Sequence, residues 1–432
     1  MSKSRKEIWL SLGVLAIGMI PVAIAGLWGY MSATATPLHP NPKDSPSVMH
    51  SAPLPKRADA VEQGRQIVRA ALPEQNLPGL SVAVGVAGDI VWAEGFGWAD
   101  LENRVPVAPD TAFRIGTASV VITSAAVGLL LEEGGLKLDD LIQTYVPAFP
   151  ETYVPAFPEK QWPVTLRQSM GHVAGVPNDG GDEGPLFTKR CQRPVDALQF
   201  FSGYERELLF EPGTQYRYSS YGWIMVSAAV EAAADEPFLT IMQKRIFDPL
   251  GMRDTRADSE MDPIANRATS YFPRFAADPR YGLHLMRPLD YSCYAGSSVF
   301  VSTPSDLVRF GMAINSGKLL QPTTVQLLQT PQRLASGQET GYGLSWDLET
   351  VALAGEQTRW IGHDGTSLGG TVASLMTFPE RGIVVSVTSN ISYADTPAIA
   401  LKIAQAFAEQ GRSPAPTASD RDVEQTPARR DR

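Results

Sequence analysis

The amino-acid sequence predicts an α+β fold, with one antiparallel sheet formed from both chain ends, covered by helices, and a mostly helical region inserted between them. Two strand-like apolar runs lie near the N-terminal side, at residues 80–86 and 90–94. Two more lie near the C-terminus, at residues 371–377 and 383–388. Between the two pairs, residues 113–254 consist mainly of helical segments separated by loops that contain Gly and Pro. Each face of such a sheet needs a helical layer over its apolar side chains.

Each pair of runs predicts a β-hairpin, because a short turn-forming segment separates the two members. The first turn is Ala87-Gly88-Asp89, and the second lies in residues 378–382, which read FPERG. Apolar residues at helical spacing predict a helix over residues 58–71, before the first hairpin. An Ala-rich segment at residues 396–409 predicts a last helix after the second hairpin.

The N-terminus predicts a membrane-directed segment. Basic residues occupy positions 3, 5 and 6, and an uncharged apolar run follows from Ile8 to Met31. A run of this length spans a bilayer as a helix, and the basic flank keeps its own end in the cytoplasm. We therefore expect residues 1–31 to be a membrane anchor or signal segment, with the domain exported to the periplasmic or extracellular side. The tripeptide Ala33-Thr34-Ala35 resembles a cleavage site, so removal of the segment stays open.

Composition divides the rest of the chain into three parts. Residues 32–58 are rich in Pro, Ser, Thr and His, and they predict a flexible stalk. Residues 59–410 are the predicted folded domain. Residues 411–432 are again rich in Pro, Ser, Ala and charge, which is typical of a disordered tail.

Charge and cysteine content limit the classes of function. The formal net charge is −9, which argues against a nucleic-acid partner, since phosphate binding needs a basic face. The two cysteines, Cys191 and Cys293, form no zinc-binding pattern, and no metal site is predicted. In an exported domain they could form a disulfide, and the alternative is two buried free thiols.

Residues 113–123, which read FRIGTASVVIT, begin a predicted helix that ends near Gly134-Gly135. Thr117 or Ser119 therefore lies close to the free backbone N–H groups of a helix N-terminus. A hydroxyl group at this place serves either as an ordinary helix cap or as a nucleophile beside an oxyanion hole. This segment alone leaves both interpretations open.

Further segments follow one another in a fixed order. They read RQSMGHVAG (167–175), FEPGTQYRYSSYGW (210–223), FDPLGMRDT (247–255), VSTPSD (301–306), GYGLSW (341–346) and WIGHDGTSLGG (360–370). Taken together with residues 113–123, they resemble the β-lactamase-related serine hydrolases. That family includes class C β-lactamases, penicillin-binding carboxypeptidases, esterases and the mitochondrial serine β-lactamase-like proteins. The resemblance covers residues 60–408 and implies a β-lactamase/transpeptidase-like fold. Within these segments we interpret His172 as a structural residue that fixes a loop.

The resemblance also implies a catalytic arrangement without a cofactor. In the family, the serine of a Ser-x-x-Lys motif opens a buried helix and acts as nucleophile, and the lysine helps to take its proton. Thr117 stands at the serine position and Val120 at the lysine position. The family's Tyr-x-Asn motif supplies a tyrosine that relays protons. Tyr218 keeps this tyrosine, and Ser220 replaces the asparagine.

The strand motif of the family, Lys/His-x-Gly, is matched by His363, Asp364 and Gly365. The resemblance assigns His363 to catalysis and the other two residues to substrate binding. The backbone N–H of Thr366 would form the second half of an oxyanion hole, beside that of Thr117.

Two departures predict impaired chemistry. The methyl group of threonine restricts its rotamers. Val120 can neither accept a proton nor supply a positive charge that would hold Tyr218 as a phenolate. Loss of a general base costs about 10²–10⁴-fold in rate. Ser119 does not restore the motif, because Ile122 stands three residues further on.

Three functional interpretations follow. The first is an exported serine hydrolase, acting on a peptide, ester or lactam and impaired by the two substitutions. The second is an inactive pseudoenzyme that binds a small-molecule or peptide ligand in the cleft, as a binding or scaffold protein. The third is a damaged or engineered copy, which would fit an exact repeat of TYVPAFPE at residues 144–151 and 152–159.

Overall fold

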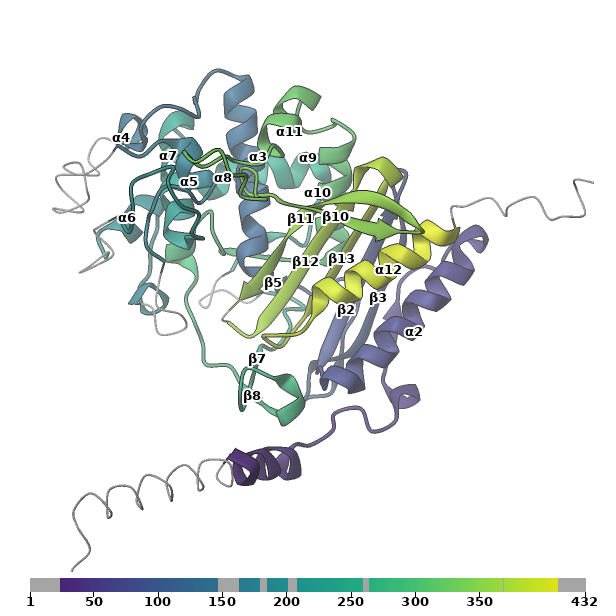
Figure 1. The fold of residues 1–432 in the computed structure, drawn as a ribbon. Helices are drawn as coiled ribbons and strands as arrows, with labels where there is room; N and C mark the ends of the chain where they lie inside the picture. The colour runs from purple at the N-terminus through teal and green to yellow at the C-terminus, as the bar shows by residue number, and fades with distance from the viewer. Residues whose placement is uncertain are drawn as a thin grey trace, which may run out of the picture.

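The computed structural model describes residues 24–146, 163–178, 185–200, 208–258, 264–367 and 369–410. Its centre is an antiparallel sheet in the order β1-β3-β2-β13-β12-β11-β10, with β4 added beside β3. The strands are β1 (Ser47–Met49), β2 (Gly79–Val86), β3 (Asp89–Asp100), β4 (Val105–Pro106), β10 (Asp347–Leu353), β11 (Glu356–Ser367), β12 (Thr371–Phe378) and β13 (Ile383–Ser389). Figure 1 shows the purple N-terminal strands beside the yellow-green C-terminal ones.

Both predicted hairpins are confirmed, and the two chain ends meet in one sheet as predicted. Strand β2 of the first hairpin pairs with β13 of the second, in a register that runs from Leu80 opposite Ser389 to Val86 opposite Ile383. Strands β12 and β13 are buried along their whole length. This burial explains their nearly continuous apolar and small residues, because both faces of these strands are covered.

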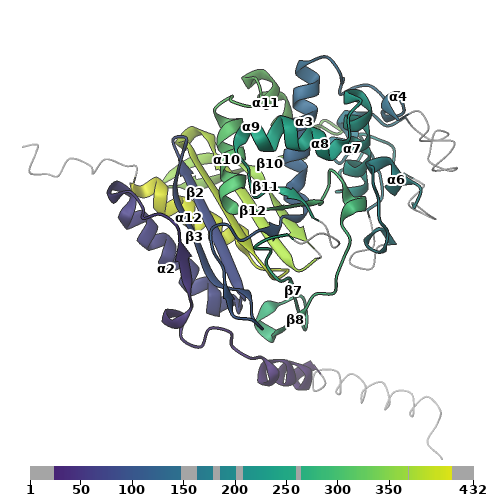
Figure 2. The ribbon, with the colours of Figure 1, turned by 180° about the vertical axis from the view of Figure 1, so that it is seen from behind.

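Helices cover both faces of the sheet. Helices α2 (Ala58–Gln75) and α12 (Thr396–Gln410) lie side by side on one face, and their apolar residues form one core cluster with the sheet. The helix α10 (Pro304–Asn315) packs against strands β2, β12 and β13 in a second core cluster, which also contains α3 (Ser119–Glu132). Figure 2 shows the sheet between α2 and α12 on one side and α10 and α3 on the other.

The inserted region is mostly helical, as predicted. Besides α3 it contains α4 (Ile142–Tyr145), α5 (Leu166–Met170), α6 (Pro194–Leu198), α7 (Ser220–Ala234), α8 (Phe238–Met242) and α9 (Asp248–Leu250), and α11 (Pro322–Leu328) follows later in the chain. Small sheets join β5 (Phe113–Arg114) with β9 (Phe300–Ser302) and β6 (Arg256–Ala257), and β7 (Tyr271–Pro273) with β8 (Leu283–Leu285). Helix α7 begins where the Ser219 hydroxyl accepts a hydrogen bond from the Gly222 N–H. It packs against α3.

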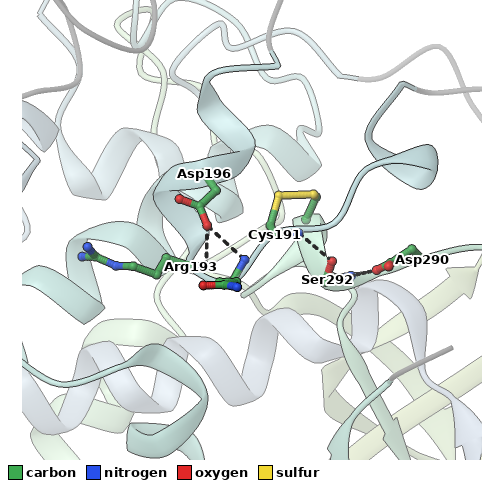
Figure 3. Close-up of a disulfide and its surroundings, with 7 residues drawn as sticks. Cys191, Arg193, Asp196, Asp290 and Ser292 are labelled. Atoms are coloured by element: carbon green, nitrogen blue, oxygen red, sulfur yellow. Dashed lines mark hydrogen bonds between the residues drawn. A yellow bond between two sulfur atoms is a disulfide. The ribbon is translucent and has the colours of Figure 1, made fainter. Parts of the chain in front are cut away.

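The two cysteines form a disulfide in the helical region (Figure 3), so they are not the two free thiols of the alternative prediction. Cys191 and Cys293 are joined across 102 residues of sequence. The Cys191 N–H donates to the Ser292 hydroxyl at 2.9 Å, and the Ser292 N–H donates to Asp290 at 2.8 Å. The bridge therefore holds the loop before α6 against residues 290–294.

The prediction of a flexible stalk over residues 32–58 is wrong for part of this segment. Residues Ser47–Met49 form β1 and pair with β3, whose backbone edge would otherwise lack partners. His39 is buried, and its ring nitrogens lie 2.8 Å from the Leu77 carbonyl oxygen and 2.7 Å from the Ser45 hydroxyl. The segment is thus ordered by contacts with the domain rather than by its own composition.

The other terminal predictions stay predictions. Residues 24–34 are helical, and Trp28 and Tyr30 make edge-to-face contacts with Tyr281 and Phe275. Within the described part of the chain, no helix has the length and apolar character to cross a membrane. Residues 1–23, the predicted tail at 411–432 and the repeat beyond residue 146 lie outside the described residues.

Candidate functional site

Thr117 lies at the start of the buried helix, as predicted. It belongs to a 3₁₀ turn, Gly116–Ala118, that continues directly into α3. Its side chain is partly exposed and lines a cleft of about 360 Å³. The Thr117 hydroxyl donates a hydrogen bond to the backbone carbonyl oxygen of Asp364 at 3.3 Å. A carbonyl oxygen orients this hydroxyl but cannot take its proton for a nucleophilic attack.

Gly365 allows β11 to approach the start of α3. A Cβ atom at this position would lie 1.9 Å from the Ile115 carbonyl oxygen and 2.7 Å from the Ala118 nitrogen. Only glycine fits, so the third residue of the His-Asp-Gly motif brings the strand against the Thr117 turn. Thr366 follows in β11, opposite Val372. Its assignment to an oxyanion hole stays a prediction.

His363 is buried, and both of its ring nitrogens are engaged. Nδ1 lies 2.8 Å from the Asp364 carbonyl oxygen, which can only accept, so Nδ1 carries the proton. Nε2 lies 3.0 Å from the Tyr342 hydroxyl and accepts its hydrogen bond. Burial lowers the pKa of His363 to about 4 and outweighs the opposing effect of Asp364. The imidazole is therefore neutral near pH 7, and its one acceptor nitrogen is already occupied.

Tyr218 lies in the cleft beside His363 and against His172. The ring centroids of Tyr218 and His172 are 4.0 Å apart, and those of Tyr218 and His363 are 6.0 Å apart. His172 accepts the Ser219 N–H at Nδ1, and its carbonyl oxygen accepts the Arg217 N–H. These bonds fit its interpretation as a loop-fixing residue. Burial and the neighbouring His363 hold the pKa of His172 well below its usual range, so it adds no positive charge beside Tyr218.

Ser220 also lines the cleft, at the first position of α7. Its backbone N–H donates to the side-chain oxygen of Asn178 at 2.9 Å. The Tyr218 and Ser220 positions thus reach the same cleft as Thr117 and His363, as the resemblance implies.

Val120 does not take part in the cleft. Its side chain is 0% exposed and belongs to the apolar core around α3, α7 and α10. Ser119 is also fully buried, and its hydroxyl has no hydrogen-bond partner among the described residues. Of these three residues, Thr117 lines the cleft, whereas Ser119 and Val120 do not.

Several cleft residues were not found from the sequence. They are Asn178, Phe187, Tyr216, Tyr291, Tyr294, Ser298, Tyr342 and Asp347. The motif GYGLSW at residues 341–346 could have indicated Tyr342, and the segment containing Tyr218 could have indicated Tyr216. Asp347 carries no local signal, because only the pairing of β10 with β11 brings it to the cleft.

Two carboxyl groups belong to the cleft lining. Burial, followed by repulsion from Glu349, raises the pKa of Asp347 to about 6. Burial also raises the pKa of Asp364 to about 6, against a hydrogen bond from Ser374. No lining residue is Lys or Arg among the residues that the structure describes. The described lining of the cleft therefore has hydroxyl groups, aromatic rings and carboxyl groups, but no amine that could accept a proton as the motif lysine does.

A known protein family matches most of this chain. The family described as Beta-lactamase matches residues 59–410. The mouse mitochondrial serine beta-lactamase-like protein LACTB is 27% identical over 451 residues, covering 81% of this chain and 80% of the relative.

Solved structures show the same fold. The octameric penicillin-binding protein homologue of Pyrococcus abyssi has a TM-score of 0.64 at 24% identity, covering 79% of this chain and 76% of its own. The D-amino acid amidase of Ochrobactrum anthropi, solved with L-phenylalanine amide, has a TM-score of 0.64 at 23% identity, covering 82% of this chain and 97% of its own. The family match, the α+β architecture and the convergence of Thr117, Tyr218 and His363 on one cleft place this chain in the β-lactamase family of serine hydrolases.

Proposed function

We propose that this chain is an exported serine hydrolase-type protein that keeps the family's ligand-binding cleft, while its acyl-transfer chemistry on a peptide, ester or lactam is strongly impaired. The single observation that carries the proposal is the position of Val120. This side chain is 0% exposed in the apolar core, at the place where the family has its lysine. Loss of that base costs about 10²–10⁴-fold in rate.

The other cleft groups do not replace the missing amine. The acceptor nitrogen of His363 is bound to the Tyr342 hydroxyl, and the Thr117 hydroxyl donates to a carbonyl oxygen. Asp347 and Asp364 would oppose the formation of a Tyr218 phenolate, because they add negative charge to the same cleft. Thr117 therefore lacks the activation that a nucleophilic hydroxyl needs.

The test is to incubate the full-length chain with a fluorophosphonate probe and with a chromogenic cephalosporin. Intact mass and colour change are measured together. We expect neither an adduct nor turnover above background. A mass adduct on Thr117 would contradict the proposal, because it would demonstrate a working nucleophile.

A restored variant distinguishes disabled chemistry from a collapsed cleft. Thr117→Ser/Val120→Lys returns the family's nucleophile and base, and it should gain labelling by the probe. Thr117→Ser/Val120→Met is the matched control, since methionine has a long side chain without the amine. Thermal unfolding of both variants reports whether residue 120 accepts the larger side chain. A folded restored variant without any labelling would contradict the idea of an intact cleft.

The second candidate function is a binding or scaffold protein with no catalysis at all. The observation that favours it is the size of the cleft, about 360 Å³, since small-molecule sites begin near this volume. Here the wild-type chain would bind ligands and never turn them over, whereas an impaired hydrolase would convert some ester or lactam slowly. Long incubations with mass detection of product separate the two.

We also propose export of the domain with an N-terminal membrane anchor. The disulfide between Cys191 and Cys293 supports an oxidising compartment, because such bonds are rare in the cytosol. Fractionation of cells, followed by protease treatment of intact spheroplasts, tests this. Protection of the domain from added protease would contradict export.

A further inference from the structure

Phenylalanine and tyrosine rings form a large part of the described cleft lining. The rings of Phe187 and Tyr294 are stacked with centroids 4.5 Å apart, and Tyr291 packs edge-on against Phe187 at 5.2 Å. The ring centroids of Tyr216 and Tyr342 are 5.8 Å apart. All five of these residues line the cleft, together with Tyr218. The faces of such rings carry negative potential and attract cations as well as apolar groups.

The charges in this cleft are negative. Asp347 and Asp364 line it, and His363 is neutral near pH 7. Arg114 lies over the Tyr291 ring at 5.0 Å, but it is paired with Asp258 at 2.6 Å and does not line the cleft. The family's lysine would have placed a positive charge here, and the buried Val120 supplies none.

Asp347 is a half-buried carboxylate without a polar partner. No hydrogen bond or ion pair to its side chain is found among the described residues, and it lines the cleft. Oδ1 of Asp364 likewise has no hydrogen-bond partner among those residues. A buried carboxylate without a partner costs free energy, and a ligand that carries N–H donors and positive charge relieves that cost.

We propose that the cleft binds a primary ammonium group joined to an aromatic or apolar body, with the ammonium held at Asp347 and the body packed among the tyrosine rings. An ammonium supplies both the N–H donors and the charge that this site lacks. A carboxylate ligand is disfavoured for the same reason, since it would meet like charge, and none of the described lining residues is a lysine or arginine. This inference deepens the binding half of the proposed function and rests on it.

The experiment is isothermal titration calorimetry of the full-length chain at about pH 7.5, above the raised pKa of Asp347. The two ligands are 2-phenylethylamine and 2-phenylethanol, its neutral counterpart of similar size. We expect the amine to bind about tenfold more tightly or better, because the desolvated cation gains both the carboxylate and the rings. Equal binding, tighter binding of the alcohol, or no binding of either at about 10 mM would overturn the inference.

Variants assign the effect to the carboxylate. Asp347→Asn should weaken amine binding about tenfold and leave alcohol binding within about twofold. Asp139→Asn is the control for loss of a carboxylate. Asp139 accepts a hydrogen bond from Arg167 at 2.7 Å and does not line the cleft, so both affinities should stay unchanged. Amine binding that survives Asp347→Asn, in a variant at least as stable as wild type in thermal unfolding, would overturn the assignment.

Failure of this inference and failure of the proposed function have different signatures. If the restored variant Thr117→Ser/Val120→Lys reacts with the fluorophosphonate while the wild-type chain shows no preference for the amine, only the ligand assignment is wrong. If the wild-type chain prefers the amine and also forms an adduct on Thr117, the ligand assignment stands and the impairment is wrong.

Discussion

The Tyr342 hydroxyl lies 3.0 Å from Nε2 of His363 and occupies the one acceptor site of this imidazole. The opposite nitrogen of the same ring donates to the Asp364 carbonyl oxygen at 2.8 Å. His363 is thereby held as a neutral ring in one tautomer and one orientation. The residue that matches the family's strand motif serves here as a fixed hydrogen-bond acceptor for a buried tyrosine.

Removal of the Tyr342 hydroxyl tests this pair. Tyr342→Phe leaves Nε2 of His363 buried without its donor, and we expect a loss of about 1–3 kcal/mol in the free energy of unfolding. The ¹⁵N resonance of Nε2 should shift as the hydrogen bond is lost. Tyr216→Phe is the control, because Tyr216 lines the same cleft but is partly exposed. If Tyr216→Phe lowered the free energy of unfolding by this amount and Tyr342→Phe did not, the hydrogen bond between Tyr342 and His363 would be contradicted.

Replacing Asp347 should stabilise the fold above pH 6. Its pKa is raised from an ordinary 3.8 to about 6, so the folded state binds more protons than the unfolded state between these values. Stability contributed by this group therefore falls as pH rises through that window. Asp347→Asn removes the penalty, and the variant should be more stable than wild type at pH 7.5 by at most about 3 kcal/mol, because the pKa of Asp347 rises to about 6 on folding.

The pH profile supplies the control for Asp347. Urea unfolding at several pH values should show the advantage of Asp347→Asn shrinking as pH falls from about 6 to about 4. Asp139→Asn should instead be less stable than wild type near neutral pH, because the Arg167 hydrogen bond lowers the pKa of Asp139. This disadvantage should shrink as pH falls and Asp139 becomes protonated. An advantage of Asp347→Asn that does not change with pH would mean that charge is not its cause.

The close approach of β11 to α3 predicts a severe effect of Gly365→Ala. The added Cβ would lie 1.9 Å from the Ile115 carbonyl oxygen, so the strand or the Thr117 turn must move. We expect a loss of more than about 3 kcal/mol in unfolding free energy. Gly222→Ala, where the nearest atom would be 3.5 Å away, should be neutral or slightly stabilising because alanine favours a helix. Similar unfolding curves for the two variants would contradict the close approach of the strand to the turn.

The disulfide predicts a redox-dependent stability. Reduction of the bond between Cys191 and Cys293 should cost roughly 2–5 kcal/mol, because it closes a long loop of 102 residues. Guanidinium unfolding with and without a reductant measures the difference. The double variant Cys191→Ser/Cys293→Ser should be as unstable as the reduced protein and insensitive to the reductant. Equal stability of the oxidised and reduced protein would show that the bridge contributes nothing.

Local patterns were sufficient for most of the architecture. Both hairpins and the helices at 58–71 and 396–409 were predicted, because the alternation of apolar residues and the turn residues are short-range signals. Strand β1 was missed, since three residues of Ser-Val-Met carry no such signal. Its order comes from the free edge of β3, which is a property of the assembled sheet.

The sequence alone determined which groups the site lacks. The sequence has threonine at position 117 and valine at position 120, and no folding of the chain can supply a serine or a lysine at those positions. Tertiary structure decided what the remaining groups do. It paired two cysteines that lie 102 residues apart, placed Asp347 in the cleft through the pairing of β10 with β11, and bound Tyr342 to His363. The physical reason is that protonation, charge and ligand preference depend on burial and on hydrogen-bond partners, and both arise only when distant segments pack together.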